Sequence, residues 1–329
     1  MGTILVTGGA GYIGSHVARQ LGERGEDLVT LDNLSTGFRS AVLHGDLVVG
    51  DTGDADLVSR LLQERGVDTI MHFAAHIVVP ESVSDPLKYY RNNTANTRTV
   101  LECAVGAGVK NFIFSSTAAV YGIPAGGIAS EDTPTMPINP HSWSKLMSEQ
   151  MLRDVSAATP VRHVALRYFN VAGADPGGRI GQSTPEATHL IKVACEQVVG
   201  KRERVSIFGT DFDTPDGTGV RDYIHVEDLA AAHLKALDYL RTGGSSTTLN
   251  CGYGSGFSVR QVLDSVAQVA GQSLNIAEGP RRAGDPPQLI AKAERIRRVL
   301  GWEPRHASLE EIAATALAWE RRLRRQPAA

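Results

Sequence analysis

The sequence predicts an α/β protein in which a Rossmann-type, doubly wound parallel sheet is joined to a smaller α/β substrate lobe. Over the first 170 residues, short apolar runs alternate with amphipathic stretches, which is typical of βαβ units. A glycine-rich turn directly follows the first apolar run. After about residue 172, glycine, proline and aspartate become frequent and the alternation is lost. We therefore expect the sheet domain over residues 1–172, with a segment near 216–238 returning to it, and the lobe mainly over 173–329.

The apolar runs of the first domain are short enough to be buried strands. We expect them at residues 3–7, 27–31, 47–49, 69–73, 111–115 and 163–167. Between the first two, apolar residues recur at helical spacing, and Gly25 closes the helix as a C-terminal cap does. A second crossover helix should end before Gly106, and another should begin beside Lys145. Right-handed crossovers then place the loops after the strands at one edge of the sheet, where ligands bind in such folds.

The lobe should contain a helix over 188–199, a strand over 205–208 and a packed terminal helix over 309–323. The terminal helix is predicted by a single apolar stripe, which consists of Leu309, Ile312, Ala316, Trp319 and Leu323.

Composition excludes several classes of protein. Of 329 residues, 42% are hydrophobic and 21% are charged, which is typical of a globular chain. Lysine and arginine (33) nearly balance aspartate and glutamate (36), so bulk charge does not favour nucleic acid or an anionic membrane. Cys103, Cys195 and Cys251 form no Cys-x-x-Cys pair, and we expect neither a metal site nor a disulfide framework. With no apolar run of membrane-spanning length and no signal peptide, we expect a cytoplasmic protein.

The strongest local signal is the glycine-rich turn over residues 8–14. Its glycines permit a tight turn and let backbone N–H groups approach a pyrophosphate at a helix N-terminus. Asp32 follows the last of them by 18 residues and ends the second strand, where an acid bonds an adenosine ribose. Because this carboxylate would repel a 2′-phosphate, we expect NAD rather than NADP. The cofactor residues predicted in the turn are Gly8, Gly11, Tyr12, Ile13 and Gly14.

Other strand ends carry weaker signals. Asp51 is placed to reach the adenine, or it is a simple turn residue. The fourth strand ends in Phe73, Ala74 and Ala75, where small alanines let a dinucleotide lie across the sheet edge, although plain close packing explains this segment equally well. Thr117, after Ser115 and Ser116, is placed to hydrogen-bond a reacting hydroxyl or carbonyl. The alternative is that these hydroxyls bond backbone groups at the strand end.

Eight ordered motifs resemble those of one family, and the resemblance extends over nearly the whole chain. They are VTGGAGYIGS, LDNLSTG, HFAA, SSTAAVYG, SKLMSEQ, LRYFNVAG, DGTGVRDYIHV and RRAGDPP. In these segments the chain resembles the UDP-glucose 4-epimerase (UDP-galactose 4-epimerase) family of the extended short-chain dehydrogenase/reductase superfamily. The resemblance implies tightly held NAD, a UDP-glucose or UDP-galactose type substrate and a homodimer. It also places Asn33, Thr52 and Asn92 at the cofactor.

The family uses a Tyr-x-x-x-Lys pair to remove the proton of the sugar 4-hydroxyl while hydride passes to NAD. Lys145 matches the lysine, but His141 stands in place of the tyrosine. On accepting a proton an imidazole becomes a cation beside Lys145, whereas a phenolate becomes neutral. Two like charges about 5 Å apart at an effective dielectric constant of 20 repel by roughly 3 kcal/mol, or about two orders of magnitude in rate.

Three explanations of His141 stay open: an altered natural base, a deliberate change, or a protein that binds NAD and a UDP-sugar without turnover. We favour an active epimerase, altered or impaired, because the other site residues match the family. A related dehydratase would follow the threonine with an acidic pair, whereas Thr117 is followed by Ala118 and Ala119.

The resemblance also predicts the substrate side. Arg221 and Arg282 match two arginines that clamp the diphosphate, which a guanidinium pairs bidentately. Asp285 matches the carboxylate at the uridine ribose, and Phe208 the aromatic ring at uracil. The remaining predicted contacts are Asn170 at the diphosphate, which equally suits a cap, His189 and Leu190 at uracil, and Leu289 where the family controls access of N-acetylated sugars.

Overall fold

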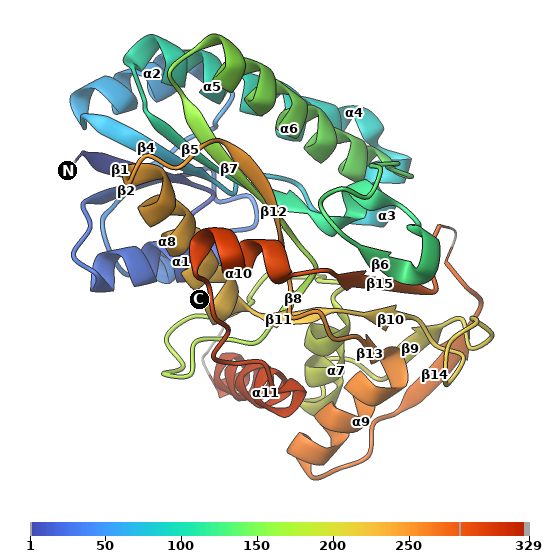
Figure 1. Cartoon of the computed structure of the whole chain (residues 1–329). Coiled ribbons are helices and arrows are strands. Elements are labelled where there is room, and N and C mark those ends of the chain that lie inside the picture. The colour runs from blue at the N-terminus through green and yellow to red at the C-terminus, as the bar shows by residue number, and fades with distance from the viewer. Residues whose placement is uncertain (1, 283, 326–329) are drawn as a thin grey trace.

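The structure is a computed structural model that describes residues 2–282 and 284–325. Its fold is built on a seven-stranded sheet. Every pair of neighbouring strands is parallel, and helices cover both faces (Figure 1). The predicted doubly wound α/β class is thereby confirmed. In sheet order the strands are β12 (Thr247–Cys251), β7 (Arg162–Tyr168), β5 (Asn111–Thr117), β4 (Val67–His72), β1 (Thr3–Thr7), β2 (Leu28–Asp32) and β3 (Asp46–Val49).

The six predicted strands of this sheet are all present, with ends shifted by at most two residues. The seventh, β12, was not expected from the sequence. It comes from beyond residue 240 and pairs with β7 at the edge of the sheet. Our division of the chain into domains stays a prediction.

The sheet has a hydrophobic core on each face, and successive apolar residues of a strand point alternately into one core and the other. Ile4 and Val6 point to one face, where they pack with residues of α1 (Tyr12–Glu23) and α8 (Val226–Arg241). Leu5 points to the other face and packs beneath α2, α5 and α6. This alternation follows from the period of two in a strand. The helices of the second face are α2 (Ala55–Glu64), α5 (Asn96–Ala107) and α6 (Pro140–Ala158).

Two predicted helix ends were wrong. The helix α5 runs through Gly106 and ends at Gly108, which adopts the left-handed conformation that glycine allows (φ +73°). The helix α6 begins at Pro140, five residues before Lys145. Asn139 caps it by accepting from the Ser142 N–H at 2.9 Å, and proline fits the first helical position.

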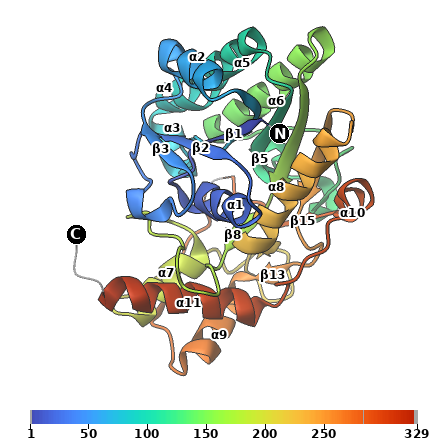
Figure 2. The same ribbon diagram turned by 90° about the vertical axis from the view of Figure 1, so that its left-hand side faces the viewer.

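The smaller lobe lies beyond the carboxyl ends of the large sheet (Figures 1 and 2). Its four-stranded sheet is ordered β13 (Phe257–Ser258), β10 (Val220–Arg221), β15 (Gln288–Ala291) and β6 (Ile128–Ala129). Two strand pairs accompany it: β11 (Tyr223–His225) with β8 (Asn170–Ala172), and β14 (Ile276–Gly279) with β9 (Val205–Phe208). Its helices are α7 (Leu190–Val198), α9 (Val259–Ala270) and α11 (Leu309–Arg325), whereas α10 (Glu294–Leu300) packs against β12 and α8 beside the large sheet.

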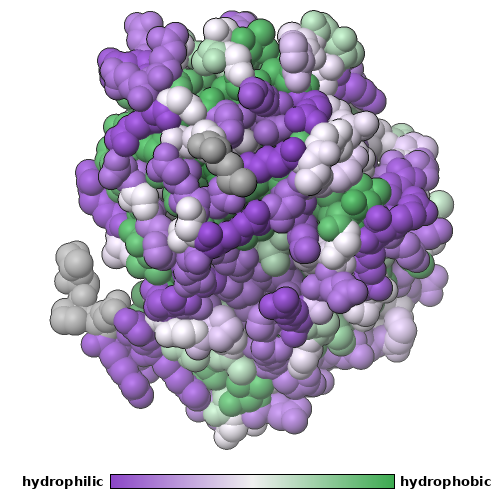
Figure 3. Space-filling view, turned by 60° about the vertical axis from the view of Figure 1, so that its left-hand side comes forward, coloured by the Kyte–Doolittle hydropathy of each residue, from purple (hydrophilic) through white to green (hydrophobic). Residues whose placement is uncertain are grey.

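Short helices make the remaining connections. They are η1 (Arg39–Ala41), α3 (Val79–Ser84), α4 (Pro86–Tyr89), the π-helical η2 (Tyr90–Ala95), η3 (Ala118–Tyr121) and η4 (Ala125–Gly127). The predicted terminal helix is confirmed as α11, and its stripe packs mainly against α7 and α9. The face drawn in Figure 3 is mostly hydrophilic, with scattered apolar side chains.

Candidate functional site

The sheet reverses its winding between β1 and β4, and ligands bind at such a switch point. The glycine turn follows β1 there and meets the segment that follows β4. Gly8 is left-handed (φ +70°), and a Cβ on it would lie 2.6 Å from the backbone nitrogen of Ala74. Only glycine allows this approach. The structure thus brings together Gly8 and Ala74, as expected at a shared cofactor edge.

The same turn opens α1 without any side-chain cap. Gly11 is the N-cap residue, and the first turn contains no acidic side chain. Backbone N–H groups at this end are therefore free to bind an anion, which the helix dipole favours. A pocket of about 350 Å³ opens beside it, and its lining includes Ala10, Gly11, Tyr12, Thr36 and Arg179.

The side chains of Tyr12 and Ile13 make contacts within the protein rather than at the cofactor site. The Tyr12 hydroxyl donates to the carbonyl oxygen of Gly173 at 2.6 Å, so its side chain fastens the turn to the segment after β8. Ile13 packs against the core. Backbone groups, rather than these side chains, remain for a dinucleotide.

Replacing Gly14 with alanine should empty the cofactor site. A Cβ at Gly14 would lie 2.3 Å from the Gly8 carbonyl oxygen, so the turn would have to move. We expect purified Gly14→Ala protein to retain less than about a tenth of the wild-type NAD, measured after denaturation, and to melt earlier. Gly106→Ala is the control, because a Cβ there meets nothing within 4 Å. Wild-type NAD content in Gly14→Ala would contradict the assignment.

Asp32 is held rigidly at the end of β2. Its Oδ2 accepts from the Ala10 N–H at 2.9 Å and its Oδ1 from the Leu34 N–H at 2.8 Å. The carboxylate thus faces the glycine turn, where a ribose would lie. We expect Asp32→Ser to bind NADP more tightly than wild type does, as measured by fluorescence titration, because the repelling charge is removed.

Of the remaining residues predicted at the cofactor, Asn33 and Asp51 are hydrogen-bonded to each other. Asp51 accepts from the Asn33 amide at 3.0 Å and from the Gly53 N–H at 2.8 Å, so it is both a turn residue and a neighbour of Asn33. Thr52 beside it is buried. Asn92 lies on η2, where its amide donates to the side-chain oxygen of Asn93 at 3.0 Å.

Asn93 was missed by the sequence analysis. It accepts from the His76 N–H at 2.8 Å and donates both to the His76 carbonyl oxygen and to Ser144 Oγ, at 3.0 Å each. It therefore fastens the loop after β4 to α6. Two successive asparagines were the only sign in the sequence.

Lys145 lies in the second turn of α6 and is buried. Its Nζ donates to the Ser115 carbonyl oxygen at 2.7 Å and lies 4.9 Å from the centre of the Phe114 ring. Burial lowers the pKa of Lys145 to about 7, although Glu149 acts in the opposite direction. The helix thus places an amine of near-neutral pKa at the carboxyl end of β5.

His141 precedes Lys145 by one helical turn and is 6% exposed. Within residues 2–282 and 284–325 its Nδ1 has no hydrogen-bond partner. Burial, and then the Lys145 ammonium, lower the pKa of His141 to about 3. The ring is therefore neutral and a weak base near pH 7. We expected repulsion by Lys145 to make His141 a weaker base, but burial lowers the pKa of His141 more than Lys145 does.

The hydroxyls at the end of β5 have separate partners. Thr117 Oγ1 accepts from the Ala119 N–H at 3.1 Å, as in the backbone-bonding alternative, and its hydrogen remains free to be donated. Ser115 bonds the Tyr168 hydroxyl, and Ser116 donates to Glu149. Of the three hydroxyls, Thr117 is the one left for a substrate.

A buried ion pair lies behind these groups and was also missed. Glu149, one turn after Lys145, pairs with Arg167 of β7, whose Nη1 donates to the Tyr121 hydroxyl at 3.0 Å. This network ties α6 to β7 and η3. Its sign in the sequence is the acid four residues after Lys145.

Four of the predicted substrate residues are in contact with one another, in two pairs. The Arg282 guanidinium lies 3.9 Å from the centre of the Phe208 ring. Arg221, mostly buried, lies 3.8 Å from Asp285 through Nη2 and Oδ1. Leu289 is buried and is paired in register with Arg221 between β15 and β10.

The other three predicted contacts are placed differently. Asn170 begins β8, and its backbone N–H donates to the Asp222 carbonyl oxygen at 2.9 Å. His189 is the N-cap of α7 and bonds Gln182 at 2.9 Å through Nδ1. Leu190 starts α7 and packs against the core. Their assignment to the substrate stays a prediction.

Comparison with known proteins settles the family. The model of the NAD dependent epimerase/dehydratase family matches residues 4–252. A UDP-glucose 4-epimerase of Azospirillum brasilense is 58% identical over 97% of this chain and 92% of its own. The solved UDP-glucose 4-epimerase of Brucella ovis, in complex with NAD, is 42% identical, with a TM-score of 0.94 over 96% of this chain and 98% of its own. The chain belongs to the UDP-glucose 4-epimerase family. The Bifidobacterium longum enzyme, solved with NAD⁺ and UDP, is 37% identical over 97% of this chain and 98% of its own, with a TM-score of 0.93.

Membership of the UDP-glucose 4-epimerase family makes NAD the cofactor, and the residues present fit it. The turn after β1 is a cradle that a Cβ would fill at Gly8 or Gly14, and the helix end behind it carries free N–H groups. The described part of the chain contains no group of three His, Cys, Asp or Glu side chains placed to hold a metal ion. It also contains no helix both long and apolar enough to cross a bilayer.

Proposed function

We propose that this chain interconverts UDP-glucose and UDP-galactose as an NAD-dependent 4-epimerase. The observation that carries the proposal is the position of Lys145. Its buried Nζ is fixed on the Ser115 carbonyl oxygen at the end of β5, on the same sheet edge as the glycine cradle. A structural lysine is mostly exposed, because burying an ammonium is costly. An amine kept there suits a reaction that needs a proton moved beside a dinucleotide.

The cofactor would be held by the turn after β1, by Asp32 and by Lys145. When bound, NAD would supply the chemistry of reversible hydride transfer at the sugar C4, which allows the configuration at that carbon to be inverted through a 4-keto sugar. The protein has to hold the sugar, exclude water and move one proton. Thr117 would donate its hydroxyl hydrogen to the sugar oxygen, while its Oγ1 accepts from the Ala119 N–H.

The proton of the sugar 4-hydroxyl would pass toward His141. A neutral imidazole has a lone pair for it, but the imidazolium formed would be buried close to the Lys145 ammonium. No acid in the described residues bonds Nδ1 to offset that charge. We therefore propose slow turnover, with His141 as a weak base.

The sugar nucleotide would be held by Arg221, Arg282, Asp285 and Phe208. Two guanidinium groups suit a diphosphate, because each can donate two N–H groups to phosphate oxygens. Arg221 lies beside Asp285 and Arg282 lies over the Phe208 ring, so the four side chains form two pairs.

Incubation of the purified protein with UDP-galactose tests the proposal. Formation of UDP-glucose without lasting absorbance at 340 nm supports a complete cycle. Accumulating NADH would mean that hydride leaves the sugar and does not return. Neither product, at high protein concentration, would contradict turnover and point to a protein that only binds.

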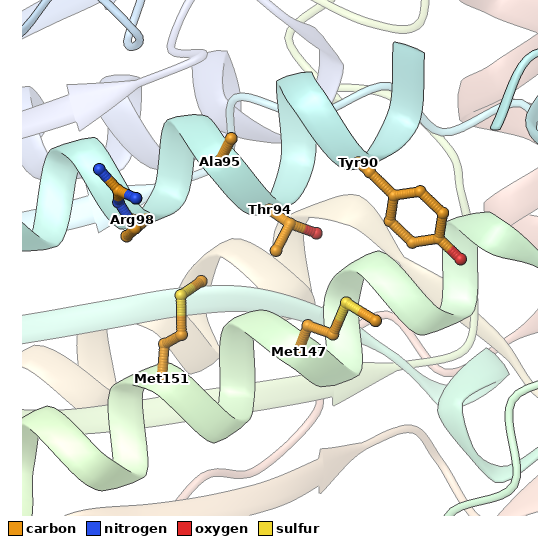
Figure 4. A pocket seen from close by; sticks show the side chains of 6 residues that line it. All are labelled: Tyr90, Thr94, Ala95, Arg98, Met147 and Met151. Atoms are coloured by element: carbon orange, nitrogen blue, oxygen red, sulfur yellow. The ribbon is translucent and has the colours of Figure 1, made fainter. Parts of the chain in front are cut away.

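We also propose that the protein is a homodimer and that copies meet across α5 and α6. An apolar pocket of about 370 Å³ lies between these helices and η2 (Figure 4). Met147 is 41% exposed there, and Trp143, one turn away, is 43% exposed. A nearly uncharged face of this kind is complementary to itself, as a two-fold interface requires. The pocket is lined by Tyr90, Thr94, Ala95, Arg98, Met147 and Met151.

A charge in this pocket should separate the copies. We expect Met147→Glu to elute as a monomer in size-exclusion chromatography with light scattering, at concentrations where wild type is a dimer. Gln268→Glu, at an exposed position of α9, should leave the mass unchanged. A dimeric Met147→Glu protein would place the interface elsewhere.

A further inference from the structure

Asp222 is a fully buried carboxylate that neither the glycine turn nor the proton-transfer group uses. It is the single residue between β10 of the small sheet and β11. Its Oδ1 accepts from the Tyr253 N–H at 3.0 Å, and its Oδ2 accepts from Gly254 at 2.9 Å and Ala291 at 3.2 Å. One side chain thus joins the segment after β12 of the large sheet to β15 of the small one.

The backbone of Asp222 adds two hydrogen bonds to this connection between the two sheets. Its N–H donates to the Leu289 carbonyl oxygen at 3.3 Å, and its carbonyl oxygen accepts from the Asn170 N–H at 2.9 Å. Three candidate substrate residues are therefore attached to it directly or are next to it in sequence: Asn170, Arg221 and Leu289.

The fit around the carboxylate is tight. A Cβ on Gly252 would lie 2.8 Å from Asp222 Oδ2. Burial raises the pKa of Asp222 to about 6, although three backbone N–H groups favour its charge. A carboxylate kept in such a place needs all three bonds, since an unpaired buried polar group is costly.

We propose that Asp222 is the positioning residue of the diphosphate site: it sets the place of Arg221 and Leu289 relative to the large sheet. Because successive side chains of an extended strand point to opposite faces, Arg221 faces the substrate while Asp222 faces the joint. Asp222 therefore acts through Arg221 without touching the ligand. This inference rests on the proposed UDP-sugar binding at Arg221.

Asp222→Asn tests it in the full-length protein. Asparagine keeps the shape but replaces one accepting oxygen with an NH₂, so at least one of the three N–H groups loses its partner. We expect UDP, titrated by calorimetry, to bind at least about tenfold more weakly. The NAD content should stay at the wild-type level, because the glycine cradle is untouched.

Asp228→Asn is the matched control. Asp228 is equally buried and also accepts from two backbone N–H groups, those of Arg305 and His306, at 2.9 Å each. The Asp228→Asn variant should have a lower melting temperature than wild type, and its affinity for UDP should stay within about twofold of the wild-type value. If Asp222→Asn does not fold, Gly252→Ala is the alternative variant, because its methyl group would press against the same carboxylate. We expect Gly252→Ala to weaken UDP binding in the same way.

The outcomes are distinct. Unchanged UDP affinity in a folded Asp222→Asn protein, or equal weakening in Asp228→Asn, would overturn the positioning role. A wild-type protein that binds no UDP at all would instead overturn the proposed function on which the inference rests.

Discussion

Replacing His141 with tyrosine should raise the rate of UDP-galactose epimerisation about 100-fold. A phenolate that takes up the sugar proton becomes neutral beside Lys145, whereas the imidazole becomes a second buried cation. The like-charge penalty of roughly 3 kcal/mol corresponds to about two orders of magnitude in rate. The measurement is kcat for conversion of UDP-galactose to UDP-glucose at about pH 6, below the pKa of about 7 of Lys145, where this amine carries its charge.

The matched control is His141→Phe, which fills the space of the phenol ring without its hydroxyl. It should be no faster than wild type, and both variants should keep wild-type NAD content. If His141→Tyr proves no faster than His141→Phe, with both folded and loaded with NAD, the phenol is not what the site lacks.

Replacing Lys145 with methionine should lower the rate at least about 1000-fold. Methionine keeps much of the length of the side chain but cannot donate to Ser115 or hold a charge at the cofactor. General acid–base groups contribute about 100-fold to 10,000-fold, and here the weak base His141 offers no substitute. The variant should still contain NAD, since the cradle after β1 is intact.

Measurements of thermal stability distinguish a loss of catalysis in Lys145→Met from unfolding of this variant. The folded pKa of Lys145, about 7, is below its ordinary 10.5. Between these values the unfolded chain holds a proton that the folded chain has released, so Lys145 makes folding more favourable as pH rises. Wild type should therefore gain stability relative to Lys145→Met from pH 7 to pH 10 in thermal melts. A constant difference across this range would show that Lys145 is not buried as described.

The sheet was predictable because its signals are local. Each strand is a short apolar run, and the glycine-rich turn over residues 8–14 leads into apolar residues at helical spacing. Asp32 was placed correctly since its distance from Gly14 reflects one βαβ unit. In contrast, β12 was missed because it joins the sheet from a distant part of the chain, which no local pattern records.

The family resemblance supplied candidate site residues, but it did not supply those that depend on tertiary contacts. Lys145, Arg221, Arg282, Asp285 and Phe208 were proposed from the resemblance and their roles stay predictions, although the structure does bring Arg221 to Asp285 and Arg282 to Phe208. Asn93, Asp222 and the Glu149–Arg167 pair depend on which backbone groups the fold presents to them. Their partners lie up to 69 residues away in the chain. The start of α6 was misjudged because Lys145, rather than the cap Asn139, was taken as the marker.

Transient hydride transfer is tested most directly with UDP-galactose that carries deuterium at C4 of the sugar. The account predicts UDP-glucose that keeps the deuterium at C4, because the hydride that leaves is the one that returns and solvent does not exchange with it. Mass spectrometry of the product would detect this. UDP-glucose that has lost its deuterium to water would contradict the account, as would the absence of any product with NAD and UDP-galactose bound.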